Sequence, residues 1–256
     1  MPPVKGTRFS KPPLREAILG VQYPMTEGVG GFVLGGFWPR VADRFSKLHW
    51  RLPEVPGPPC KLVSSNEDYV LQILDSGFYL SWVKSENGSD YPEFSSLLEV
   101  FQGFFVQFQT FLHEIALPGP SVTALTMGFT NIVEKPADAE AAWLTAAFPD
   151  FCWRPGHRSS PPRFVSFLTQ FENPEVTGDS LVARIEGPYS SSVPAAEHIR
   201  FLLEATKSMP SVEEFGANAI PWDWYLAAKR KLNQLFLDLT DSQFRLDHWG
   251  EGDIRC

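Results

Sequence analysis

The chain has 256 residues, of which 43% are hydrophobic, 20% are charged and 14% are aromatic. This composition is typical of a globular protein with a buried core and excludes an intrinsically disordered chain. Its formal charge of -8 argues against non-specific binding of nucleic acid, which depends on a positive surface that neutralises phosphates. We therefore do not expect nucleic acid as a partner.

Secretion and membrane insertion are not expected. The N-terminal residues lack the apolar core of a signal peptide, and no apolar run approaches the roughly 20 residues of a membrane-spanning helix. The three cysteines, Cys60, Cys152 and Cys256, lie far apart and form no C-x-x-C pair, so neither a disulfide framework nor a zinc site is predicted. We expect a cytoplasmic protein.

The first part of the chain begins with an arm and continues into a strand and a helix. Residues 1–13 contain four prolines and are expected to be extended. Apolar residues 17–23 predict a strand, and the glycine run at 28–36 predicts a flexible connection. Apolar side chains then recur at helical spacing, which predicts a helix over 37–50.

Three strands and a long helix are expected next. Residues 60–65, 69–74 and 77–84 predict strands, and the turn residues between them predict an antiparallel meander. Pro92 suits the first turn of a helix, where a missing N–H has no consequence. The apolar stripe of that helix consists of Phe94, Leu97, Leu98, Phe101, Phe105, Phe108, Leu112 and Ile115.

The second half follows a similar order. The pattern predicts a strand, a helix, three strands and a closing helix at residues 122–134, 137–148, 162–171, 180–187, 198–206 and 221–239. Both halves therefore read as β-α-β-β-β-α, over 14–120 and 121–256, within one compact unit. We predict the α+β class, with antiparallel sheet or sheets covered by helices on one face. A duplication is a hypothesis, because no residue-level repeat supports it.

The C-terminal stretch LFLDLTDSQFRLDHWG, residues 235–250, contains acidic residues that resemble a catalytic or metal cluster. Asp241 and Ser242 suit a turn, because their side chains bond to the local backbone, and we interpret the stretch as structural. The glycine run is also no dinucleotide loop, because Val33 stands where G-x-G-x-x-G requires glycine. None of the five histidines has metal-ligand spacing. No metal, cofactor or catalytic residue is therefore predicted.

Two basic segments have an open interpretation. The first is a loop that contains Arg154, His157, Arg158 and Arg163. It could bind an anion, because guanidinium groups bind such ligands bidentately, but we favour the alternative that the charges are only solvated. The same ambiguity applies to the second segment, which consists of Lys229, Arg230 and Lys231.

Four segments in this order, KPPLREAILGVQY, YLSWVK…YPEF, LTMGFTNIVE and LFLDLTDSQFRLDHWG, resemble a family. It is a sporadically distributed bacterial family of uncharacterised proteins of about this length. The matching residues are Pro12, Pro13, Glu16, Tyr91, Pro92, Phe94, Asn131, Ile132, Leu239, Thr240, Trp249 and Gly250. Phe129 replaces the usual tyrosine of the family.

The resemblance covers nearly the whole chain and implies one intact unit, but it implies no established activity. The patchy distribution of the family is similar to that of mobile-element cargo, such as toxin–antitoxin or phage-defence components. By this analogy, a protein partner would be encoded by a neighbouring gene.

Two functions remain open. The first is a non-enzymatic binding or regulatory protein, with Tyr79, Trp82 or Trp153 as contact anchors and with a protein partner or a second copy bound. The second is a small-ligand binder or enzyme with a site between the two halves. Its candidate residues are Glu16, Asn131, Arg154, His157 and Asp241.

Overall fold

The computed structural model describes residues 7–24, 29–50, 60–86, 88, 90–135, 143–150, 165–172, 179–187, 198–209 and 220–253. Its centre is a nine-stranded antiparallel sheet. In spatial order the strands are β3 (Lys47–Trp50), β4 (Cys60–Val63), β5 (Tyr69–Leu74), β6 (Gly77–Val83), β2 (Leu14–Gln22), β7 (Ala124–Glu134), β10 (His198–Ser208), β9 (Asp179–Gly187) and β8 (Val165–Glu172).

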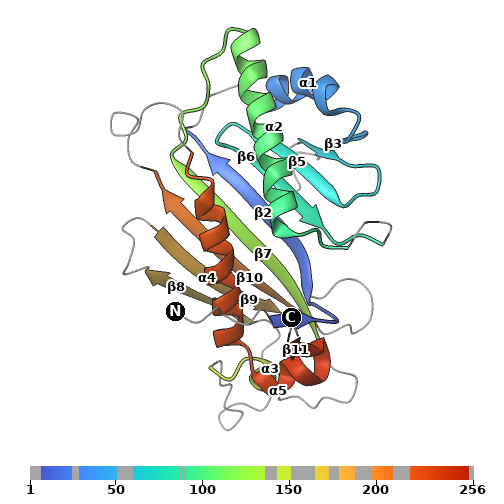
Figure 1. Cartoon of the computed structure of the whole chain (residues 1–256), viewed down its shortest axis with the longest axis vertical. Helices are drawn as coiled ribbons and strands as arrows, with labels where there is room; N and C mark the ends of the chain where they lie inside the picture. Colours follow the sequence, from blue (N-terminus) through green and yellow to red (C-terminus); the bar gives the residue numbers. More distant parts are fainter. Residues whose placement is uncertain are drawn as a thin grey trace.

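Three long helices cover one face of this sheet (Figure 1). They are α1 (Val29–Val41), α2 (Phe94–Glu114) and α4 (Asp223–Leu239). The predicted α+β class, with an antiparallel sheet and helices on one face, is thus confirmed. A sheet covered in this way buries one face and alternates apolar and polar side chains along its strands.

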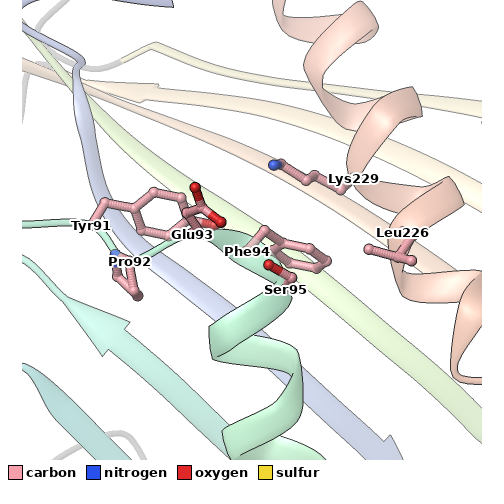
Figure 2. Close-up of a pocket in the computed structure, with 7 residues that line it drawn as sticks. All are labelled: Tyr91, Pro92, Glu93, Phe94, Ser95, Leu226 and Lys229. Carbon is pink, nitrogen blue, oxygen red and sulfur yellow. The ribbon is translucent and has the colours of Figure 1, made fainter.

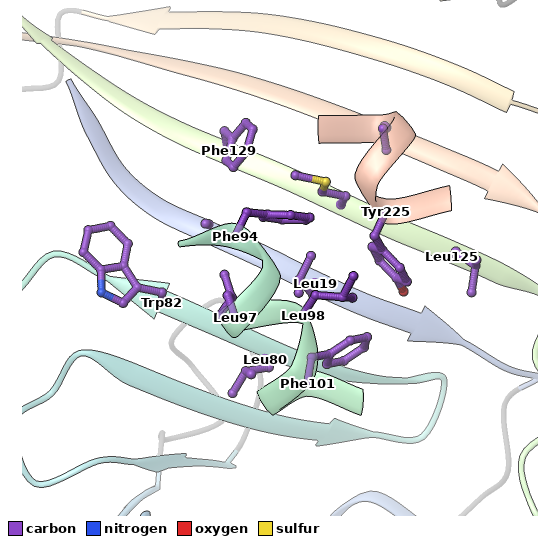
Figure 3. Close-up of a cluster of buried hydrophobic side chains, with 14 of the residues drawn as sticks. Leu19, Leu80, Trp82, Phe94, Leu97, Leu98, Phe101, Leu125, Phe129 and Tyr225 are labelled. Atoms are coloured by element: carbon purple, nitrogen blue, oxygen red, sulfur yellow. The ribbon is translucent and has the colours of Figure 1, made fainter. Parts of the chain in front are cut away.

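The core between helices and sheet is rich in aromatic rings (Figure 3). Phe78 of β6 contacts Phe105 and Phe108 of α2, with ring centroids 5.5 and 5.1 Å apart. Phe101 of α2 lies 5.7 Å from Tyr225 of α4. The predicted stripe from Phe94 to Leu112 is therefore the face that α2 buries, and it joins the two halves through α4. Ile115, its last predicted member, lies beyond the end of the helix and is exposed.

The strand order is symmetric about the central pair β2–β7. On either side lie β6 and β10, then β5 and β9, then β4 and β8, whereas β3 adds a strand to the first half only. The central pair is in register with Leu19 opposite Met127, so one sheet runs through both halves. A duplication of the chain stays a prediction.

The segment from residue 28 to residue 50 differs from the expectation. The glycine run is not a flexible connection, because α1 begins at Val29 and includes most of it. Val33, Phe37 and Val41 recur every four residues and are fully buried, and this apolar periodicity outweighs the low helix propensity of glycine. Residues 47–50 form β3, which pairs with β4, instead of extending the helix.

A close approach explains one glycine of α1. A Cβ on Gly36 would lie 2.9 Å from the ring of Phe111 on α2. Because such a contact is shorter than van der Waals distance, only glycine lets the two helices approach this closely.

The two ends of the described chain meet in a small clasp. Strand β1 (Thr7–Phe9) pairs with β11 (Glu251–Asp253), directly after α5 (Ser242–Phe244) and the π-helical turn Arg245–Trp249. The buried ring of Trp249 contacts Phe9 and Phe236. The expected arm at residues 1–13 thus contributes a strand over its described part.

Candidate functional site

A pocket of about 550 Å3 lies where α2 begins beside α4 (Figure 2). Its lining residues are Tyr91, Pro92, Glu93, Phe94, Ser95, Leu226 and Lys229. The first five belong to the first half of the chain and the last two to the second half. The volume falls within the range of small-molecule sites, and the pocket lies between the halves.

The Tyr-Pro-Glu-Phe segment builds one wall of the pocket because it starts α2. The backbone of Glu93 is extended, with φ -54° and ψ 137°, and its carbonyl accepts the first helical hydrogen bond from Leu97 N at 3.1 Å. Phe94 is 3% exposed and fixes this end of the helix in the core. The Tyr91 ring packs edge-on against Trp82, with centroids 5.1 Å apart.

Lys229 supplies the cation of the pocket. Its Nζ lies 5.2 Å from the centroid of the Phe94 ring, within the range of a cation–π contact. Burial lowers the pKa of Lys229, and the charge of Glu93 opposes this shift. Among the described residues, neither Lys229 nor Glu93 has a salt-bridge partner within 4.0 Å.

A second surface lies on the face of the sheet opposite α1, α2 and α4, and we call it the open face. Its side chains alternate with the core-facing ones of the same strands. Its central residues are Glu16, Ile18, Gly20, Gln22, Tyr79, Ser81, Thr126, Gly128, Thr130, Leu202, Glu204 and Thr206.

Tyr79 lies flat at the centre of the open face. A Cβ on Gly20 would lie 2.3 Å from its Cδ1 atom, and a Cβ on Gly77 would lie 2.5 Å from its Cε2 atom. The two glycines therefore leave the space that the ring fills. Beside it, Gln22 Nε2 donates a 3.0 Å hydrogen bond to Thr126 Oγ1. The ring is thus an aromatic contact fixed on a rigid sheet.

Two carboxylates flank the centre of the open face, whereas Arg184 and Arg200 lie farther out on the same face, where both pair with Glu186. Glu16 accepts a long hydrogen bond of 3.5 Å from Thr130 Oγ1, and Glu204 accepts one of 3.3 Å from Thr206 Oγ1. Partial burial raises the pKa of Tyr79, and the charge of Glu204 adds to this shift, while a hydrogen bond with Gln22 opposes it. In the described part of the chain, no cation pairs with either carboxylate.

The structure does not bring the three described candidates of the second hypothesis together. Glu16 lies on the open face, whereas Asn131 faces the helices and donates a 3.3 Å hydrogen bond to the carbonyl of Phe201. Asp241 accepts a 2.8 Å hydrogen bond from Phe244 N at the start of α5. None of the three lines the pocket. Arg154 and His157 lie outside the described residues.

The C-terminal acids have local structural partners. Asp241 caps α5, Asp238 accepts from Gln234 at 2.7 Å, and Asp247 accepts from Gln243 at 2.9 Å. The sequence interpretation overlooked Arg245, which is 8% exposed. This side chain bonds to Glu251 at 2.7 Å and to the carbonyl groups of Leu237 and Thr240. The stretch therefore forms the clasp.

Of the predicted aromatic anchors, Tyr79 is partly exposed on the open face, but Trp82 is 2% exposed and belongs to the core. Trp153 lies outside the described residues. The pocket pair Glu93 and Lys229 was not predicted as a site, although Lys229 was noted as an ambiguous cation.

No described helix is long and apolar enough to cross a membrane. Nor do the described residues include three or more His, Cys, Asp or Glu side chains grouped as a metal site. The chain matches no protein-family model, no curated protein and no solved structure in the comparisons with known proteins.

Proposed function

We propose that the chain is a non-enzymatic binding protein that engages a partner protein through the open face of its sheet. The observation that carries this proposal is the fixed ring of Tyr79, which lies on Gly20 and Gly77 at the centre of a surface that spans both halves. Rigid aromatic side chains at the centre of an interface supply much of its binding energy.

The chemistry of the open face favours a basic segment as its occupant. Glu16 and Glu204 flank the centre without a cationic partner among the described residues. Lysine or arginine side chains of a partner would meet both carboxylates, and the overall charge of -8 would speed the approach of such a partner. A polar side chain of the segment would meet Gln22, which is partly exposed and is held by its hydrogen bond to the buried Thr126.

The family resemblance directs the search for this partner to neighbouring genes. In that setting the chain acts in the cytoplasm as the regulatory or recognition component of a toxin–antitoxin or phage-defence module. Nucleic acid is not its partner in this proposal, because the central carboxylates would repel phosphates.

Native mass spectrometry of the chain, co-expressed with the products of its adjacent genes, tests the proposal. The expected result is a complex of the chain with one neighbour-encoded protein that dissociates as the salt concentration rises, because exposed charges are screened. A monomer or a homo-oligomer under all co-expression conditions would contradict the proposal.

A small-ligand function is the second candidate, and the pocket between α2 and α4 favours it. Of the residues that the sequence predicted for this function, the three that the structure describes, Glu16, Asn131 and Asp241, do not line the pocket. Its support therefore rests on Glu93 and Lys229.

A further inference from the structure

We propose that the pocket between α2 and α4 binds a free α-amino acid with an apolar side chain. The pocket lies on the helical side of the sheet (Figure 2), away from the open face. The inference is therefore independent of the proposed protein partner, and either can fail without the other.

The polar end of the pocket requires a ligand with both charges. Lys229 offers an ammonium group without a hydrogen-bond acceptor among the described residues, and Glu93 offers a carboxylate without a described donor. A simple anion would be attracted by Lys229 but repelled by the negative charge of Glu93. A simple cation would be attracted by Glu93 but repelled by the positive charge of Lys229. A neighbouring carboxylate and ammonium on one ligand satisfy both side chains at once.

The apolar part of the pocket suits a hydrophobic side chain. Pro92, Phe94 and Leu226 contribute to its lining, and Leu226 is 36% exposed. Covering this surface would remove apolar area from water, which favours binding. The volume of about 550 Å3 accommodates a leucine or phenylalanine side chain together with the charged end.

Isothermal titration calorimetry with L-leucine and L-phenylalanine tests the inference in the full chain. N-acetyl-L-phenylalanine lacks the ammonium group, and L-phenylalaninamide lacks the carboxylate. We expect each derivative to bind the wild-type chain about tenfold more weakly than the amino acid, because each loses one charge-assisted hydrogen bond.

Two variants assign the two charges. Glu93→Gln should weaken binding of the amino acid about tenfold without weakening binding of the N-acetyl derivative. Lys229→Met keeps the apolar stem and should weaken binding of the amino acid but not of the amide. Unchanged binding of the N-acetyl derivative by Glu93→Gln, and of the amide by Lys229→Met, shows that each variant is folded. Arg230→Gln, on the same helix, is the matched control.

Three results would overturn the inference. The first is no heat of binding with either amino acid at millimolar concentration. The second is equal affinity of the wild-type chain for the amino acid and both derivatives. The third is a uniform loss for all ligands in both variants, which would show that the two charges do not recognise separate groups.

Discussion

Tyr225 Oη donates a 2.6 Å hydrogen bond to the backbone carbonyl of Gly20. Tyr225 belongs to α4 in the second half of the chain, whereas Gly20 lies in β2 of the first half, so the bond ties both halves together. The tyrosine is fully buried and burial raises its pKa. The same glycine supports Tyr79 on the opposite face, and this one residue therefore connects the core with the open face.

Replacement of Tyr225 with Phe should lower the free energy of unfolding by about 1–3 kcal/mol, because it removes the partner of a buried carbonyl. Tyr91→Phe is the matched control. The Tyr91 hydroxyl is buried and has no hydrogen-bond partner among the described residues, so its removal should leave stability unchanged or raise it. Urea unfolding curves of the two variants measure the difference. A loss of the same size in both would refute this assignment of the two hydroxyls.

Gly250→Ala should destabilise the clasp between the chain ends. Gly250 has φ +62°, a conformation that disfavours a side chain, and its Cβ would lie 2.0 Å from Ser10 Oγ. We expect a loss of at least about 1 kcal/mol. At Gly252 a Cβ would meet no atom within 4 Å, so Gly252→Ala is the control. Thermal unfolding followed by tryptophan fluorescence compares them, and indistinguishable melting temperatures would contradict the clasp.

The protein should lose stability in alkali. Burial raises the pKa of Tyr23, Tyr91 and Tyr225 above the ordinary value of 10.0. These phenols stay neutral in the folded chain while the unfolded chain ionises, so the stabilisation is complete below pH 10 and is lost as pH rises above it. In an absorbance titration of tyrosinate, the buried tyrosines should ionise at a higher pH than the other tyrosines, and their ionisation should coincide with unfolding. Immediate, reversible ionisation of all tyrosines near pH 10 would argue against their burial.

The sequence predicted the regular elements where one periodicity prevailed. The strands β5, β6 and β7 alternate or are continuously apolar, and α2 carries its phenylalanines at helical spacing, so their types were predictable. The first part of helix α1 was not, because its glycines point to a loop, while the packing against Phe111 that favours a helix comes from a distant segment. Only the end of α1, residues 37–41, falls within the predicted helix. The three-residue strands β1 and β11 are too short for any pattern.

The candidate sites were harder to predict because they depend on residues far apart in the chain. Glu93 and Lys229 line one pocket although 136 positions separate them, and local spacing cannot reveal such a pair. Glu16 and Asn131 lie on neighbouring strands but on opposite faces, because strand register decides which way each side chain points. Gly20 and Gly77, the glycines under Tyr79, lie far apart in the sequence. Their common role beside this ring is evident only in the folded sheet.

The most direct test of the proposed function is the effect of charge reversal on the open face. The double variant Glu16→Lys and Glu204→Lys should weaken binding of the neighbour-encoded partner at least about tenfold, because like charges would then meet at the centre of the interface. Glu99→Lys, on an exposed position of α2, reverses a single charge on the helical side and should leave the affinity unaltered. Equal affinities of the double variant and the wild-type chain would contradict the proposal that the open face binds the partner.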